Sequence, residues 1–247
     1  MPNSVSAPTP LQTDFDVIRN VIRIATSDEA LVKLRFDLGR FVAQNYSETG
    51  EELRVMGQTI GADRKSGVSP FGNGSDETVA ISTLLRIAAQ LVSASTDLFQ
   101  DGRSYAAAAL LRQLVEIEYL AWAMETKNGD AERWLRSDKK QREEFFKPEK
   151  LRKAAAGKFR GQDYGYHCEM GGHPVPSAAL LLAGEPEISQ LMLSDLLGHA
   201  GRIWEHLVGW SREQLLGSPI LTRTPQMRER FMAWKAADPL VGLPPPP

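Results

Sequence analysis

The chain has 247 residues, of which 42% are hydrophobic and 24% are charged, and its formal net charge is −2. These values are typical of a folded globular protein and argue against disorder across the body of the chain. The balanced charge excludes a basic field over the whole molecule that would gather nucleic acid. A single cysteine, Cys168, excludes an intrachain disulfide framework and a metal site made of cysteines alone.

Residues 1–10 are polar and rich in proline, so we expect a flexible tail and no signal peptide. No uncharged apolar run approaches the roughly 18 residues that a membrane-spanning helix requires. We therefore expect a cytoplasmic protein that does not contact a membrane. No cofactor motif is present in the sequence, and no cofactor is expected.

Helical spacing of apolar residues dominates the first quarter of the chain. It predicts a helix over residues 11–25 and a second helix capped by Ser27, which residues 51–60 extend or follow. Residues 61–74 collect glycine, serine and proline without periodicity, which predicts a long loop. Ser75 then caps a third helix that ends near Phe99, and a tight connection leads into a helix over residues 105–125. These two helices should form an antiparallel hairpin.

Shorter helices are predicted over residues 131–136, 138–146 and 148–156, and a long one from Pro186 to about residue 216. Thr224 and Pro225 should cap and begin a terminal helix that reaches Trp234. The sequence thus predicts an all-α protein, a helical bundle built on a long antiparallel hairpin with shorter flanking helices. Its expected parts are a tail (1–10), N-terminal helices and a loop (11–74), the main bundle (75–217), and a terminal helix with a proline tail (218–247).

The segment 105–125, YAAAALLRQLVEIEYLAWAME, is apolar on nearly every side, which is typical of a helix surrounded by other helices. Within it, Arg112 and Glu116 are four residues apart and share a face. A basic residue placed before an acidic one is the less favourable order for an exposed pair, so helix stability alone explains the pair poorly. Two interpretations stay open: a structural ion pair between helices, or a polar pocket inside the bundle.

All four histidines fall between His167 and His206. The close spacing of His167, Cys168 and His173 raises the question of zinc, but it matches no standard signature. His199 and His206 are seven residues apart, about 10.5 Å along a helix, which is too far for one ion. Hydrogen-bonded core histidines are therefore favoured, no metal site is expected, and a metal-dependent hydrolase is the third hypothesis.

The stretch AALLRQLVEIEYLAWAM, followed about 50 residues later by YHCEMGGHP, resembles a family of uncharacterised bacterial all-helical domains. Its members carry an Arg-x-x-x-Glu helix and a later Tyr…Ser-Glu…His-Pro segment, and their helical arrangement is similar to the HEPN superfamily. The resemblance spans about residues 78–176. It implies a site made of Arg112, Glu116, Tyr166, Glu169 and His173.

Two departures from the family pattern stand in the second motif. Cys168 occupies the serine position, and Gly171 with Gly172 makes the spacing to His173 one residue longer. In catalytic HEPN proteins, histidine assists attack by the RNA 2′-hydroxyl while arginine stabilises the phosphate, without a metal.

The resemblance therefore implies a protein that binds or cleaves RNA or nucleotides as a defence or stress effector, with metal-independent ribonuclease as the enzymatic form. It also implies a homodimer formed across the polar face. The alternative is a non-catalytic helical interaction module in which Arg112, Glu116 and His173 form a structural network.

Residues 131–160 hold 11 Lys or Arg against 5 Asp or Glu, interleaved with aromatic residues: Trp134, Phe145, Phe146 and Phe159. This pattern fits a phosphate-binding surface. It also fits solvated amphipathic helices whose aromatic side chains dock on the bundle. This second interpretation is the one that we favour from the sequence.

Overall fold

The computed structural model describes residues 10–59, 75–127, 129–159, 161–215 and 218–241. It is 86% helical and the described residues contain no strand, which confirms the predicted all-α class. The predicted tail, the 61–74 loop and the proline end lie outside the described residues.

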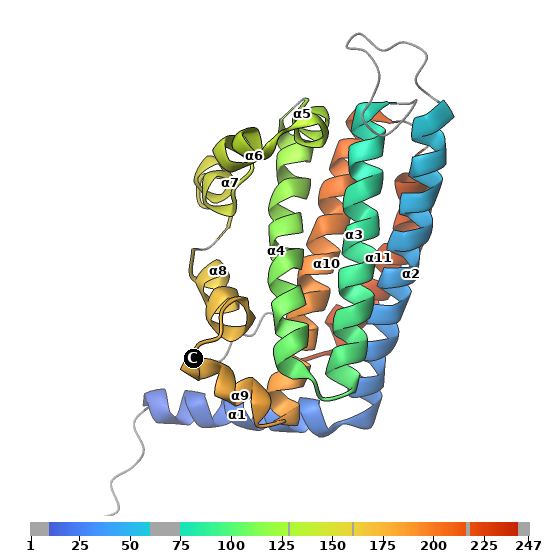
Figure 1. Cartoon of the computed structure of the whole chain (residues 1–247). Helices are drawn as coiled ribbons and strands as arrows, with labels where there is room; N and C mark the ends of the chain where they lie inside the picture. The colour runs from blue at the N-terminus through green and yellow to red at the C-terminus, as the bar shows by residue number, and fades with distance from the viewer. Residues whose placement is uncertain (1–9, 60–74, 128, 160, 216–217, 242–247) are drawn as a thin grey trace, which may run out of the picture.

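The bundle consists of long helices that lie side by side (Figure 1). They are α2 (Glu29–Thr59), α3 (Asp76–Gln100), α4 (Ser104–Thr126), α10 (Pro186–Gln214) and α11 (Pro219–Ala237). Helix α1 (Pro10–Ser27) lies across one end of them. Ser75 caps α3, as predicted, and Gly102 adopts a positive φ of 72° in the short turn between α3 and α4. These two helices form the predicted antiparallel hairpin.

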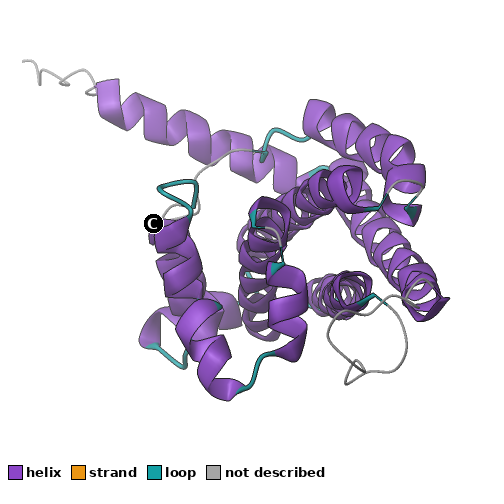
Figure 2. Cartoon of the chain, turned by 90° about the horizontal axis from the view of Figure 1, so that it is seen from above, coloured by secondary structure: helices purple, strands orange, loops and turns teal. Residues whose placement is uncertain are grey.

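A chain of short elements runs alongside α4 before the long helix α10 begins (Figures 1 and 2). It comprises α5 (Asp130–Arg136), α6 (Lys139–Phe145), α7 (Pro148–Ala154), α8 (Gly161–His167), a π-helical turn (Cys168–Gly172), a 3₁₀ turn (Pro176–Ala178) and α9 (Ala179–Leu182). The sequence predicts no element for residues 157–176. Helix α8 and the π turn form there because both pack against α4, which supplies the stability that local periodicity lacks.

One cluster of buried side chains extends through the molecule from Leu38 on α2 to Trp234 on α11. Helix α4 contributes to it on several faces, since α3, α10 and the π turn all pack on it. Helix α3 has the length and apolar composition to cross a bilayer, and 67% of that apolar stretch is buried inside the protein. A buried core helix meets the same two criteria.

Two predicted helix starts are wrong. Asp28, not Ser27, caps α2, because its carboxylate accepts from the backbone N–H groups of Ala30 and Leu31. Helix α11 begins at Pro219 behind the Ser218 cap, so Pro225 lies inside the helix instead of starting it. For α11, residue types that cap helices occur at the observed start, Ser218, and at the predicted one, Thr224. The helix begins at the earlier of the two because of the apolar face that it buries.

A buried ion pair joins α2 to the end of α11. Arg35 and Asp238 are fully buried, and two hydrogen bonds connect them, Nε to Oδ2 at 2.6 Å and Nη2 to Oδ1 at 2.7 Å. The guanidinium also donates to the carbonyl of Ala25 and to the amide oxygen of Gln190. Four helical segments are therefore connected through one side chain, a feature that the sequence analysis did not identify.

Candidate functional site

Two groups of polar side chains lie between α4 and its neighbours. We call the first the Arg112 cluster; it consists of Arg112, Glu116 and Tyr164. We call the second the histidine cluster; its members are His167, Asp195, His199, Glu118 and Arg202. Helix α4 contributes to both clusters, and α8 contributes Tyr164 to one and His167 to the other.

In the Arg112 cluster the three side chains form a closed triangle. Arg112 Nη2 lies 3.0 Å from Glu116 Oε1 and donates to the Tyr164 hydroxyl at 3.1 Å, and that hydroxyl donates to Glu116 Oε1 at 3.1 Å. Arg112 and Glu116 retain 28% and 33% of their side-chain exposure, so solvent and solutes reach the pair. The hydrogen bond to Tyr164 and the charge of Glu116 outweigh burial and raise the pKa of Arg112. Arg112 is therefore a permanent cation at this site.

A second guanidinium reaches the same ring. The Cζ of Arg152, on α7, lies 4.5 Å from the centroid of the Tyr164 ring, and that of Arg112 lies 5.8 Å from it. Cation–π contacts of this kind hold a guanidinium in place without neutralising its charge. Two guanidinium groups thus lie against the ring of Tyr164, and the carboxylate of Glu116 is paired with one of them.

The other three residues that the sequence singled out, Tyr166, Glu169 and His173, form no hydrogen bond or ion pair with this triangle among the described residues. Tyr166 is half-buried, and its ring packs edge-on against His167 with the centroids 5.4 Å apart. Burial, together with the nearby charge of Asp195, raises the pKa of Tyr166. His173 is exposed at the end of the π turn, as is Glu169 within it. Tyr164 occupies the place beside Arg112 that the sequence analysis gave to Tyr166.

The segment from Cys168 to His173 forms a π-helical turn. The backbone N–H of His173 donates to the carbonyl of Cys168, five residues earlier, at 3.1 Å. A π-helical turn accommodates one more residue than an α turn. Gly171 is buried against α4, where an added Cβ would lie 2.5 Å from the backbone carbon of Ala108. Glycine therefore permits the close approach that keeps α8 and the π turn on α4.

In the histidine cluster, imidazole and carboxylate atoms gather where α8 meets α10. His167 Nε2 lies 3.3 Å from His199 Nε2 and 3.3 Å from Asp195 Oδ2, and His199 Nε2 lies 3.5 Å from Asp195 Oδ1. Both histidines are buried, whereas Asp195 retains 38% of its side-chain exposure. Burial is the largest influence on His167 and lowers its pKa to about 4.

Glu118, on α4, contacts His199 and Arg202 of this cluster. Its carboxylate lies 2.6 Å from His199 Nδ1 and accepts from Arg202 Nε at 2.8 Å. Burial acts to raise the pKa of Glu118, but His199 and Arg202 together outweigh burial and lower the pKa to about 2. Two groups contact His199 Nδ1: the Glu118 carboxylate at 2.6 Å, which only accepts, and Arg202 Nη2 at 2.8 Å, which only donates. In the pairing with Glu118, the shorter contact, Nδ1 carries the hydrogen. The lone pair of a neutral His199 is then on Nε2, which faces His167 and Asp195.

His206, like His173, belongs to neither cluster. His206 pairs with Glu125 on α4, Nδ1 to Oε2 at 2.5 Å, two turns further along α10. The separation that the sequence predicts for His199 and His206 agrees with these different partners.

The aromatic side chains of the basic stretch 131–160 dock on the bundle. Phe146 is buried in the core, and Trp134, Phe145 and Phe159 pack against it. Several basic side chains remain outside, among them Lys139, Lys140 and Lys150, whereas Arg136 and Arg152 are half-buried. The stretch therefore presents cations to solvent but no aromatic platform for base stacking.

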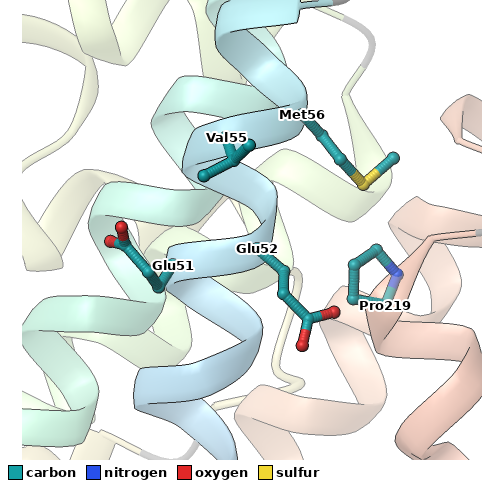
Figure 3. Close-up of a pocket in the computed structure, with 5 residues that line it drawn as sticks. All are labelled: Glu51, Glu52, Val55, Met56 and Pro219. Atoms are coloured by element: carbon teal, nitrogen blue, oxygen red, sulfur yellow. The ribbon is translucent and has the colours of Figure 1, made fainter.

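A shallow pocket lies apart from both clusters, between the end of α2 and the start of α11 (Figure 3). Glu52 and Met56 line it opposite Pro219, while Glu51 lies on the side of α2 toward α3. Glu52 is already paired with Arg223 at 2.7 Å. Among the described residues that line it, the pocket gathers no combination of nucleophile, base and cation.

Sequence reasoning placed Arg112 and Glu116 on one face but missed Tyr164, Asp195 and the partnership of Glu118 with His199. The Asp-x-x-x-His spacing of Asp195 and His199 is a signal that could have paired those two residues on one helix face. Their approach to His167 depends on how α8 packs, which local spacing does not reveal. Comparison with known proteins gave no match to this chain, either among protein-family models, among curated proteins or among solved structures.

Proposed function

We propose that the protein binds RNA through its phosphates, with the Arg112 cluster as the specific contact and the exposed lysines of residues 131–160 as the surrounding basic surface. The observation that carries the proposal is that two guanidinium groups, those of Arg112 and Arg152, lie against the ring of Tyr164 at a partly exposed site. Arginine is well suited to phosphate because its planar fork donates two parallel hydrogen bonds. The HEPN-like resemblance of the same segments supports RNA as the anion.

The basic stretch extends this cluster. Helix α7 carries Arg152 and packs against α4, and α6 and α7 present Lys139, Lys140 and Lys150 to solvent. Phosphate contacts from such side chains supply affinity without sequence preference. Because the neighbouring aromatic side chains are packed on the core, we expect little discrimination between bases.

The test measures the affinity of a labelled single-stranded RNA by fluorescence anisotropy over a series of salt concentrations. Each phosphate contact to a single strand contributes about 0.7 to the slope of log affinity against log salt. Replacing three exposed lysines of the basic stretch with glutamine should therefore reduce the slope by about 2; these are Lys139, Lys140 and Lys150. The matched control replaces three exposed basic residues elsewhere, namely Arg19, Lys33 and Lys235, and should leave the slope nearly unchanged.

Substitutions inside the cluster separate binding from a structural role. Arg112→Gln should weaken RNA binding about 10–100-fold, since a hydrogen bond to a charged group contributes about 1.5–3 kcal/mol. Glu116→Gln removes the competing carboxylate, so it should leave RNA affinity unchanged or raise it. A loss of RNA affinity in Arg112→Gln without a loss in Glu116→Gln supports the proposal. Equal losses of melting temperature without any change in affinity contradict it.

That last result favours the second candidate, an interaction module with a structural Arg112–Tyr164–Glu116 network. The closed triangle is the observation in its favour, because each of the three side chains contacts the other two. Cleavage is the finer form of the RNA proposal. It is tested by incubating RNA with the protein in chelator and comparing His173→Ala, which alters an exposed side chain.

A further inference from the structure

The histidine cluster brings three side chains with metal-binding atoms to one point. The facing atoms are Nε2 of His167, Nε2 of His199 and a carboxylate oxygen of Asp195, and all lie within 4.8 Å of one another. Two of these residues, Asp195 and His199, are one turn apart on α10, and His167 comes from α8. The cluster takes no part in the proposed RNA contact, which uses other residues.

The separations match those of ligands around a four-coordinate zinc ion. Two atoms bound at about 2.0–2.1 Å and at the tetrahedral angle lie about 3.3 Å apart. The two histidine nitrogens are 3.3 Å apart, and each lies 3.3 or 3.5 Å from an oxygen of Asp195. The histidine nitrogens therefore lie at this distance from each other, and each lies near it from one oxygen of the Asp195 carboxylate, Oδ2 for His167 and Oδ1 for His199.

The surroundings of His199 are those of a metal ligand. Its Nδ1–H is directed to the Glu118 carboxylate at 2.6 Å, so the ring is fixed with Nε2 toward His167 and Asp195. Arg202 holds the other oxygen of Glu118 at 2.8 Å. His167 Nδ1 is buried and lacks a hydrogen-bond partner among the described residues, so the orienting carboxylate acts on His199 alone.

We propose that His167, Asp195 and His199 form a binding site for one Zn²⁺ ion, oriented by Glu118. Three protein ligands leave one position of a tetrahedron open, which is the coordination of zinc sites that bind water or a substrate. The exposed fraction of Asp195, 38%, provides access from solvent to the buried histidines. The sequence analysis considered His167 with Cys168 and His173, and expected no metal; the cluster in the structure shares only His167 with that set.

The alternative is a hydrogen-bonded histidine pair that takes no cation. In that arrangement one imidazole donates its Nε2–H to the other or to Asp195. The two arrangements differ in a direct way: only the metal site binds a stoichiometric cation, and only its affinity depends on Asp195 as a ligand.

The experiment titrates chelator-treated full-length protein with Zn²⁺ by calorimetry and with Co²⁺ by visible absorption. We expect one ion per chain and the intense Co²⁺ absorption of four-coordinate sites. Asp195→Asn should weaken binding by at least about 100-fold, beyond the 10–100-fold that loss of an outer partner such as Glu118 costs. Asp195 is partly exposed, so this substitution preserves the fold, which circular dichroism of the metal-free variant checks.

His206→Gln is the matched control, because His206 is a buried histidine on the same helix that also pairs with a glutamate. It should bind Zn²⁺ as the wild type does. Failure of the wild type to bind one equivalent overturns the proposal, as does undiminished binding by Asp195→Asn. Weak Co²⁺ absorption, which six-coordinate ions give, overturns the four-coordinate assignment. None of these outcomes depends on RNA binding, so the two proposals fail separately.

Discussion

The buried pair of Arg35 and Asp238 leads to a quantitative prediction about stability. Both side chains have zero exposure, and the carboxylate also accepts from Trp234 Nε1 at 2.8 Å and from the backbone N–H of Leu240 at 3.0 Å. Arg35→Met removes the cation and leaves this carboxylate buried. Breaking one side of such a pair costs about 3–5 kcal/mol. For a chain of this length, each kcal/mol lowers the melting temperature by about 2–4 °C, so we expect a fall of about 6–20 °C.

Urea denaturation followed by circular dichroism measures the free energy of unfolding, and an unchanged slope with denaturant shows that the unfolding transition is the same. The double variant Arg35→Met/Asp238→Leu should recover much of the loss, because buried pairs replaced by apolar side chains are often neutral. Arg228→Met is the control: its partner Glu205 is half exposed, so the cost should stay below about 1 kcal/mol. A loss below about 1 kcal/mol for Arg35→Met, or additive losses in the double variant, would refute the reasoning.

Three further predictions concern packing, pH and helix geometry. Gly171→Ala should cost about 1–3 kcal/mol because its Cβ meets the backbone of α4, whereas Gly165→Ala, with open space, should be neutral or stabilising; thermal unfolding compares them. The hydrogen bond from Arg228 lowers the pKa of Glu205. The pair therefore stabilises the fold fully above the ordinary glutamate pKa of about 4.3, and this stabilisation is lost as the pH falls through the lowered pKa of Glu205. Arg228→Gln should therefore differ from the wild type in urea titrations at pH 7 but not at about pH 2. Pro225→Ala should raise the free energy of unfolding by up to about 3 kcal/mol, since the substitution restores a helical N–H inside α11; an unchanged midpoint in urea would contradict this.

The fold could be predicted where local signals and packing agree. Ser75 with acidic residues behind it marks the start of α3, and Pro148 starts α7. The apolar circumference of α4 indicated a central helix, and α3, α10 and the π turn pack on it. The prediction failed at Pro225, where a strong local signal for a helix start lies within a helix that tertiary contacts extend.

The contacts within the candidate sites could be predicted from the sequence to a smaller extent than the fold. Arg112 and Glu116 could be paired because four residues separate them on one helix. Tyr164 and Tyr166 are equivalent by type and nearly by position, and only the rotation of α8 about its axis decides which hydroxyl reaches Arg112. Glu118 and Arg35 looked like ordinary charges, since their partners lie 81 and 203 residues away in sequence.

The π turn bears on how relatives of this chain would be recognised. Cys168 and His173 are five residues apart and joined by a backbone hydrogen bond, so the additional glycine widens the coil locally and adds no separate loop. A homologue with one residue fewer would make an α turn here and could present equivalent side chains from the same place on α4. The gap between these two positions is therefore expected to vary by one residue among related proteins, while the small residue packed against Ala108 stays fixed.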